Sequence, residues 1–117
     1  MTDAIDAFNR SVSADRPRLY VLGCMEELGD ASADYHQQLG RTMHLRRGDF
    51  IFIIGDQASA LREGLLENGN DAAQVSVITD LAAVRERLTT FNGAVFLKGS
   101  RRYRLETALD ASLVHTD

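Results

Sequence analysis

Four short runs of apolar residues, rich in β-branched and aromatic side chains, are spaced along the chain. They lie at 19–22, 50–54, 75–78 and 94–97. Within each run the apolar residues mostly do not alternate with polar ones, which is typical of strands buried on both faces of a parallel sheet. We therefore expect four interior strands.

The segments around these runs carry apolar residues at intervals of three or four, the spacing of an amphipathic helix. The series are Ile5, Phe8 and Val12; Tyr35, Leu39 and Met43; Ala58, Leu61 and Leu65; Leu81, Val84, Leu88 and Phe91; and Leu105, Ala108 and Leu109. This alternation of helix and strand predicts an α/β fold, with a mainly parallel sheet between two layers of helices. The 117 residues are enough for one domain, and we expect residues 1–117 to form it.

Composition indicates a soluble globular protein, because 44% of the residues are hydrophobic and 26% are charged. No apolar run approaches the roughly 18 residues of a membrane helix, and the first ten residues include acids where a signal peptide needs basic residues. The single cysteine, Cys24, cannot form an intrachain disulfide. We expect a cytoplasmic protein with no membrane partner.

The net charge of -4 argues against general nucleic-acid binding, which depends on neutralising phosphates with Lys and Arg. One stretch is nevertheless cationic, since Lys98, Arg101, Arg102 and Arg104 occur without an intervening acid. The three histidines lack the spacing of a metal site. We therefore expect no metal site and no nucleic-acid partner.

In an open parallel sheet, ligands bind beyond the carboxyl ends of the strands. The last predicted strand runs into Lys98, Gly99 and Ser100 just before a predicted helix. Free N–H groups at the start of that helix, the Ser100 hydroxyl and the Lys98 ammonium would form a small anion site. The alternative is that Ser100 only caps its helix and that the basic side chains are solvated.

Cys24 follows the first predicted strand, so a thiol nucleophile with His36 as its base is a second possibility at this edge. No Gly-x-Cys-x-Gly or Cys-x-x-Cys pattern supports it, and a lone cysteine at a strand end is usually a small buried hydrophobe. The chain also lacks Gly-x-Gly-x-x-Gly and the P-loop pattern. If ATP is involved, other residues must hold most of it.

Three segments resemble a known family. LGCMEELG at 22–29, YHQQLG at 35–40 and FLKGSR at 96–101 are similar to the LGDMxELG, xHxxxG and VLVKGSR segments of the C-terminal domain of the Mur ligases, and above all of the MurF type. MurF enzymes are UDP-N-acetylmuramoyl-tripeptide:D-alanyl-D-alanine ligases of peptidoglycan precursor synthesis. The likeness extends over about residues 1–111. The motifs at 22–40 and at 96–101 occur in the expected order and at the expected separation, which makes the likeness fairly specific.

The resemblance implies a Rossmann-like, three-layer αβα domain that is one part of a three-domain enzyme. In the family, an N-terminal domain holds the UDP-sugar peptide and a central ATPase domain uses ATP and Mg²⁺ to activate its carboxylate. The C-terminal domain closes over the reaction and helps to bind the incoming amine. We expect this chain to be that lid, without the other two domains, without tight ATP or Mg²⁺ binding and without catalysis when isolated.

The resemblance also implies which residues bind a D-alanyl-D-alanine-like amine substrate. They are Gly23, Cys24, Met25, Glu27, Lys98, Gly99, Ser100 and Arg101. None of them is expected to be a catalytic residue or a metal ligand. Cys24 stands where the family usually has an acid, so a contact that this acid makes with the substrate amine or a basic neighbour is missing here.

Two other functions are consistent with the sequence. A free-standing Rossmann-like binding module would recognise an anionic ligand or an acidic partner through the basic stretch at 98–104. A thiol enzyme would use Cys24 and would require a thiol of lowered pKa.

Overall fold

The computed structural model describes residues 2–13, 16–24 and 31–99. Its elements, in chain order, are α1 (Thr2–Ser11), β1 (Arg18–Gly23), α2 (Ser32–Thr42), β2 (Phe50–Ile54), α3 (Ala58–Glu67), the short 3-10 helix η2 (Ala72–Gln74), β3 (Val75–Ile78), α4 (Ala82–Leu88) and β4 (Ala94–Lys98). The four predicted strands and the first four predicted helices are confirmed. The fifth predicted helix, around 105–109, lies outside the described residues.

The strands form one sheet in the order β3-β2-β1-β4, and every neighbouring pair is parallel. In register, Leu19 lies opposite Phe50 and Val95, so β1 is an inner strand, as is β2. The expectation of four interior strands is wrong for β3 and β4, each of which has one neighbouring strand among the described residues, and Val77 of β3 is exposed. The predicted α/β fold with a parallel sheet is therefore confirmed. The sequence pattern does not specify the strand order.

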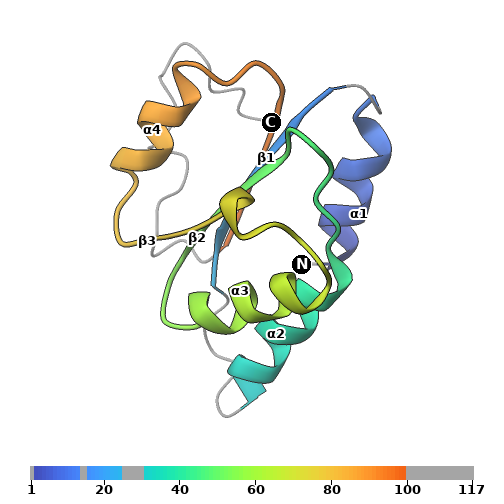
Figure 1. The fold of residues 1–117 in the computed structure, drawn as a ribbon, viewed down its shortest axis with the longest axis vertical. Coiled ribbons are helices and arrows are strands. Elements are labelled where there is room, and N and C mark those ends of the chain that lie inside the picture. Colours follow the sequence, from blue (N-terminus) through green and yellow to red (C-terminus); the bar gives the residue numbers. More distant parts are fainter. Residues whose placement is uncertain (1, 14–15, 25–30, 100–117) are drawn as a thin grey trace.

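Helices cover both faces of the sheet (Figure 1). On one face, α1, α2 and α3 pack over alternate residues of β1 and β2 in a core that includes Ile5, Tyr20, Leu39, Ile53 and Leu61. On the other face, α4 packs over the remaining residues in a second core. Its buried members are Leu19, Val21, Phe52, Ile54, Leu81 and Val84. Strands with apolar residues on both faces explain the continuous apolar runs in the sequence.

The helices α2 and α3 pack with their backbones almost touching, because a glycine of each helix faces the other. A Cβ on Gly40 would lie 2.4 Å from the carbonyl oxygen of Leu61. A Cβ on Gly64 would meet the backbone of Gln37 more closely still. Arg41 and Glu67 join the two helices at the surface, with 2.7 Å between Nε and Oε2. This rigid pair supports the α3 side of the sheet.

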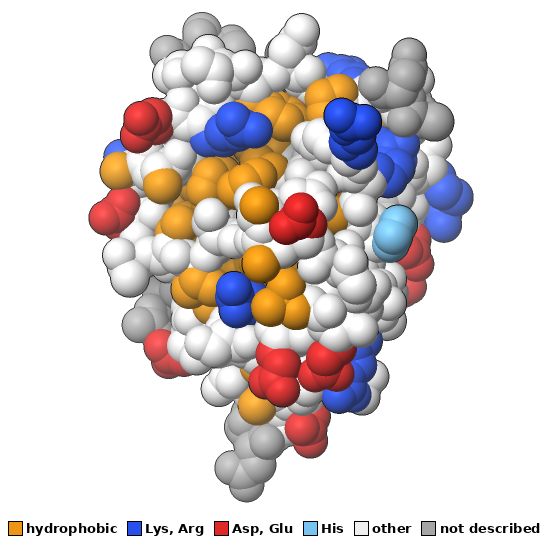
Figure 2. Space-filling view, in the orientation of Figure 1, with side chains coloured by type: hydrophobic (Ala, Val, Ile, Leu, Met, Phe, Trp, Pro, Cys, Tyr) orange, Lys and Arg blue, Asp and Glu red, His pale blue; other side chains and the backbone are white. Residues whose placement is uncertain are grey.

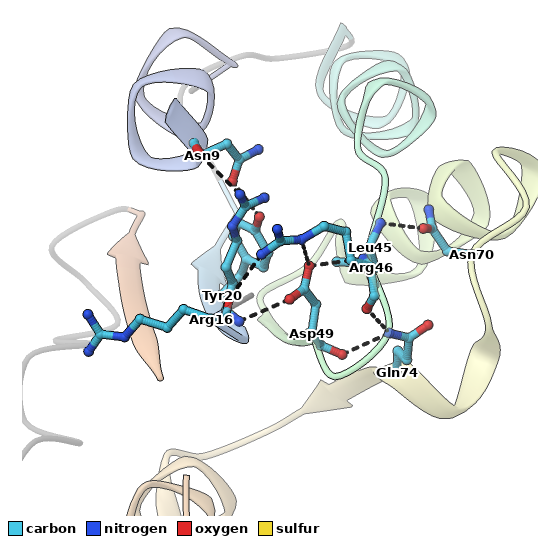
Figure 3. A network of polar contacts seen from close by, with 9 residues as sticks. Asn9, Arg16, Tyr20, Leu45, Arg46, Asp49, Asn70 and Gln74 are labelled. Atoms are coloured by element: carbon cyan, nitrogen blue, oxygen red, sulfur yellow. Dashed lines mark hydrogen bonds and ion pairs between the residues drawn. The ribbon is translucent and has the colours of Figure 1, made fainter. Parts of the chain in front are cut away.

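A buried carboxylate organises the amino-terminal end of the sheet (Figure 3). Asp49 accepts hydrogen bonds from the backbone N–H groups of Arg18 and Arg46, both at 2.9 Å. Gln74 donates to the carbonyl oxygens of Arg46 and Asp49. Asn70 donates to the carbonyls of Met43 and Leu65. The loop before β2 is therefore tied to β1 and to the segment before β3.

One further polar contact fixes α1 to the sheet. The Tyr20 hydroxyl donates to Asn9 Oδ1 at 2.6 Å, and the Arg18 guanidinium donates to the Asn9 carbonyl oxygen at 3.1 Å. A tyrosine hydroxyl is protonated at neutral pH, and burial raises the pKa of Tyr20 further, so this hydroxyl acts as a donor. In the described part of the chain, no helix is long and apolar enough to cross a membrane.

Candidate functional site

The carboxyl ends of the four parallel strands lie along one edge of the sheet. Gly23 ends β1, Gly55 follows β2, Thr79 follows β3 and Lys98 ends β4. The opposite edge is closed by the Asp49 network and by the hydrogen bond from Ala94 N–H to the Pro17 carbonyl oxygen. Because all four strands are parallel, the residues that follow them start from the carboxyl edge, which is where ligands bind in such a sheet.

The end of β1 and the residue that follows β4 are in direct backbone contact. A Cβ built on Gly99 would lie 2.6 Å from the Cα, 2.7 Å from the nitrogen and 2.8 Å from the oxygen of Gly23. Real Cβ atoms essentially never come so close to another backbone, so only glycine fits at position 99 without a shift. The structure thus brings together the two segments that carry the sequence motifs.

Cys24 lies at the start of the loop after β1, and its side chain is 2% exposed. Its backbone N–H donates to the carbonyl oxygen of Ile54 at 2.9 Å, which joins the ends of β1 and β2. Burial raises the pKa of the Cys24 thiol, and the negative charge of Asp56 also raises it, although a backbone hydrogen bond from Gln57 acts in the opposite direction. A neutral, buried thiol packs as a small hydrophobe, and this argues against the thiol-enzyme reading.

His36, the candidate base for that thiol, is fully buried on α2. Its Nδ1 is 2.7 Å from the carbonyl oxygen of Ser32, one turn earlier, and its ring lies edge-on to that of Tyr35. These contacts fix the imidazole within the core. His36 therefore has a packing role in the described structure.

Three described charged residues are exposed at this edge: Asp56 after β2, Asp80 after β3 and Lys98 at the end of β4. Asp80, after β3, is engaged locally, since its Oδ1 accepts a hydrogen bond from the N–H of Ala82 at 2.8 Å. This bond satisfies the N–H of Ala82, the first residue of α4, whose N-cap residue is Leu81 and makes no side-chain cap hydrogen bond. α4 begins at Ala82 and ends at Leu88, so Phe91 of the predicted series lies beyond it.

Of the eight predicted site residues, Gly23, Cys24, Lys98 and Gly99 are described, and they lie together at the carboxyl edge. Met25, Glu27, Ser100 and Arg101 lie outside the described residues, as do Arg102 and Arg104. Whether the eight contact a substrate remains a prediction. Asp56 was not among them, although its position directly after a buried strand and a glycine is the signal that marks this edge.

A shallow groove with a volume of about 420 Å³ runs beside α4, lined in part by Phe52, Ala83 and Glu86. Arg87 also lines it and lies over the ring of Phe50 at 5.4 Å. Figure 2 shows hydrophobic side chains interspersed with Lys and Arg in this region. The second half of α4 leads back toward the amino-terminal edge of the sheet, so the groove does not belong to the carboxyl-edge site.

The described residues contain no group of three His, Cys, Asp or Glu side chains that could hold a metal ion. In its described part, the carboxyl edge offers the ammonium of Lys98, the carboxylates of Asp56 and Asp80, and closely packed backbone. Such a surface can bind and orient a small charged molecule.

Comparison with known proteins gives a consistent family. The family model described as "Mur ligase, glutamate ligase domain" matches residues 1–101. A UDP-N-acetylmuramoyl-tripeptide–D-alanyl-D-alanine ligase from Buchnera aphidicola subsp. Acyrthosiphon pisum is 28% identical over 97 residues, which cover 80% of this chain and 20% of that protein.

Solved structures give the same result. One crystal structure of MurF from Acinetobacter baumannii is similar with a TM-score of 0.68 and 25% identity, covering 92% of this chain and 24% of that one. A second crystal structure of the same protein has a TM-score of 0.56 and 30% identity, covering 77% of this chain and 20% of that one. The chain thus spans between a fifth and a quarter of the length of these relatives.

Proposed function

Because the chain belongs to the Mur ligase family, we propose that it is the C-terminal, amine-substrate-binding domain of a ligase of the MurF type. Such a ligase would add D-alanyl-D-alanine to UDP-N-acetylmuramoyl-tripeptide during peptidoglycan precursor synthesis in the cytoplasm. The observation that carries the proposal is the close backbone contact between Gly23, at the end of β1, and Gly99, just after β4, because each belongs to one of the two segments that carry the family motifs. The similarity to MurF-type ligases supports the choice of reaction.

The contribution of this chain to the reaction is binding and orientation. The exposed ammonium of Lys98 suits the carboxylate of a D-alanyl-D-alanine-like substrate, because charge-assisted hydrogen bonds are stronger than neutral ones. Holding the dipeptide in one orientation removes part of the entropic barrier to amide formation. The other predicted residues, among them Ser100 and Arg101, would complete the carboxylate site.

ATP and Mg²⁺ belong to the complete ligase, and the described residues of this chain do not fit them. The described residues hold no metal-ligand cluster, and the chain has no P-loop pattern. The N-terminal and central domains of such a ligase would therefore be the partners of this chain, and the central domain would hold the nucleotide.

A domain exchange tests the proposal. The C-terminal domain of Acinetobacter baumannii MurF would be replaced by this chain, and formation of the UDP-linked pentapeptide would be measured against the truncated protein. The proposal predicts ligation that depends on D-alanyl-D-alanine, with a raised KM when Lys98→Met is introduced. A folded chimera with no more activity than the truncated protein would contradict it.

A further inference from the structure

The carboxyl edge carries opposite charges on the two sides of β1. Asp56 lies two residues beyond the end of β2, and Lys98 is the last residue of β4. β1 pairs with both of these strands, so the two charges flank its end. Neighbouring strands are about 4.8 Å apart, which places the two chain segments roughly 10 Å from each other.

Lys98 and helix α3, which follows Asp56, lie on the same face of the sheet. Lys98 pairs in register with Leu22, which is part of the core beneath α1, α2 and α3. Cys24 belongs to that core as well, and α3, which starts just after Asp56, packs on the same face. The influence of the Asp56 charge on the thiol of Cys24 agrees with a carboxylate close to the end of β1.

The Asp56 carboxylate has no structural task in the described part of the chain. The N-cap residue of α3 is Gln57, and that helix has no side-chain cap. By contrast, Asp71 and Asp80, which hold similar positions before η2 and α4, each accept a hydrogen bond from a backbone N–H. Among the described residues, no ion pair involves Asp56 or Lys98. Two opposite charges are therefore exposed and available to a ligand.

We propose that Asp56 binds the ammonium group of the incoming amine substrate while Lys98 binds its carboxylate, so that this edge selects a zwitterion. The inference rests on the proposed function and adds to it a residue for the nitrogen that reacts. An extended dipeptide spans about 7 Å. With one charge-assisted hydrogen bond of about 2.8 Å at each end, it reaches both side chains.

The role of Asp56 is to hold the nitrogen, not to activate it. Only the neutral amine attacks an acyl carbon, so the ammonium must lose a proton before the C–N bond forms. Asp56 captures the charged form that predominates at neutral pH and fixes the position of its nitrogen. Cys24, at the end of β1, is uncharged and buried. Among the described residues, the exposed acid beside the end of β1 is therefore Asp56.

NMR titration of this chain with three probes tests the inference. The probes are D-alanyl-D-alanine, its N-acetyl derivative, which lacks the ammonium, and its C-terminal amide, which lacks the carboxylate. We expect N-acetylation to weaken binding about tenfold, the effect of losing one charge-assisted hydrogen bond. Asp56→Asn should weaken binding of the parent dipeptide by the same factor and leave binding of the N-acetyl derivative unchanged.

Two variants complete the design. Lys98→Met should remove the preference for the free carboxylate over the amide and retain the preference for the free ammonium. Asp71→Asn makes the same charge change away from this edge and should alter neither preference. Asp56 is exposed, so Asp56→Asn should leave the spectrum of the folded chain intact.

The outcomes separate this inference from the proposed function. If the parent dipeptide binds at the carboxyl edge but its N-acetyl derivative binds equally well, the role of Asp56 is overturned and the proposed function stands. The role of Asp56 would also be overturned if Asp56→Asn weakened binding of the parent dipeptide and of its N-acetyl derivative by the same factor. If no probe binds at millimolar concentration, both the inference and the proposed function fail.

Discussion

The backbone of Gly99 lies directly against that of Gly23, with only 2.6 Å between an ideal Cβ on Gly99 and the Cα of Gly23. These residues are 76 positions apart in the sequence, yet each belongs to one of the segments that carry the family motifs. The parallel pairing of β1 with β4 brings them to the same level of the sheet. The close contact makes the backbone position of Gly99 depend on that of Gly23.

Gly99→Ala should therefore disturb the packing between the ends of β1 and β4. The methyl group would meet backbone atoms rather than a flexible side chain, so the strand ends must separate. We expect a loss of about 1–3 kcal/mol in the free energy of unfolding, typical of overpacking. Urea denaturation would measure it, with the exposed Gln38→Ala as a control that should stay within about 0.5 kcal/mol of the parent. Equal stability of the two variants would show that the backbones of Gly23 and Gly99 are not in close contact.

Removing the Asp49 carboxylate should destabilise the amino-terminal end of the sheet. In Asp49→Ala the backbone N–H groups of Arg18 and Arg46 lose their acceptor, and the first of these bonds is buried. We expect a cost of about 2–3 kcal/mol, the penalty of leaving buried donors unsatisfied. The matched variant Asp71→Ala removes one exposed bond and should cost no more than about 1 kcal/mol. Thermal or urea unfolding that gives the two variants the same cost would contradict this role.

The Cys24 thiol should react slowly. Its pKa is raised mainly by burial, so the thiolate fraction at neutral pH is smaller in the folded chain than in an unfolded one. Alkylation rates measured against pH should show a midpoint above that of the urea-unfolded chain, and Asp56→Asn should move the midpoint down. Because the folded pKa is raised, this group stabilises the fold below the unfolded pKa and loses that effect as the pH rises through the folded value. A midpoint below that of the unfolded chain would support the thiol enzyme instead.

The surface pair between α2 and α3 should be visible in the titration of Glu67. The hydrogen bonds from Arg41 and Gln37 lower the pKa of this carboxyl. Arg41→Met should therefore raise the pKa of Glu67 toward its ordinary value, as measured by carbon-detected NMR of the carboxyl group. Because the folded pKa is lowered, the stabilisation by this pair is present above the unfolded pKa and is lost as the pH falls through the folded one. An unchanged pKa in the variant would show that the pair does not form in solution.

The sequence predicted the layers of the fold because each layer leaves a local signal. Continuous apolar runs such as 50–54 mark strands buried on both faces, and spacings such as Ala58, Leu61 and Leu65 mark helices. The strand order leaves no local signal, since it depends on which crossover packs over which face. The Asp49 network was also missed, because it joins loops that are distant in sequence.

The proximity of the described candidate site residues was predictable from the sequence. Gly23, Cys24, Lys98 and Gly99 do lie together, since strand ends converge in any parallel sheet. The close contact between the two glycines could not be predicted, because it depends on β1 and β4 being neighbours. The exposed charge of Asp56 gains its meaning only from the position of β2 beside β1.

The most direct test of the account is to map the binding of D-alanyl-D-alanine on this chain by NMR. The account predicts that the largest shifts fall on backbone amides at the carboxyl edge, at Gly23, Cys24 and Gly99, and that they saturate at millimolar dipeptide. Amides near Asp49, at the opposite edge, should not move. Shifts confined to that opposite edge or to the groove beside α4, or no shifts at all, would contradict the assignment of this chain as the amine-binding domain of a ligase.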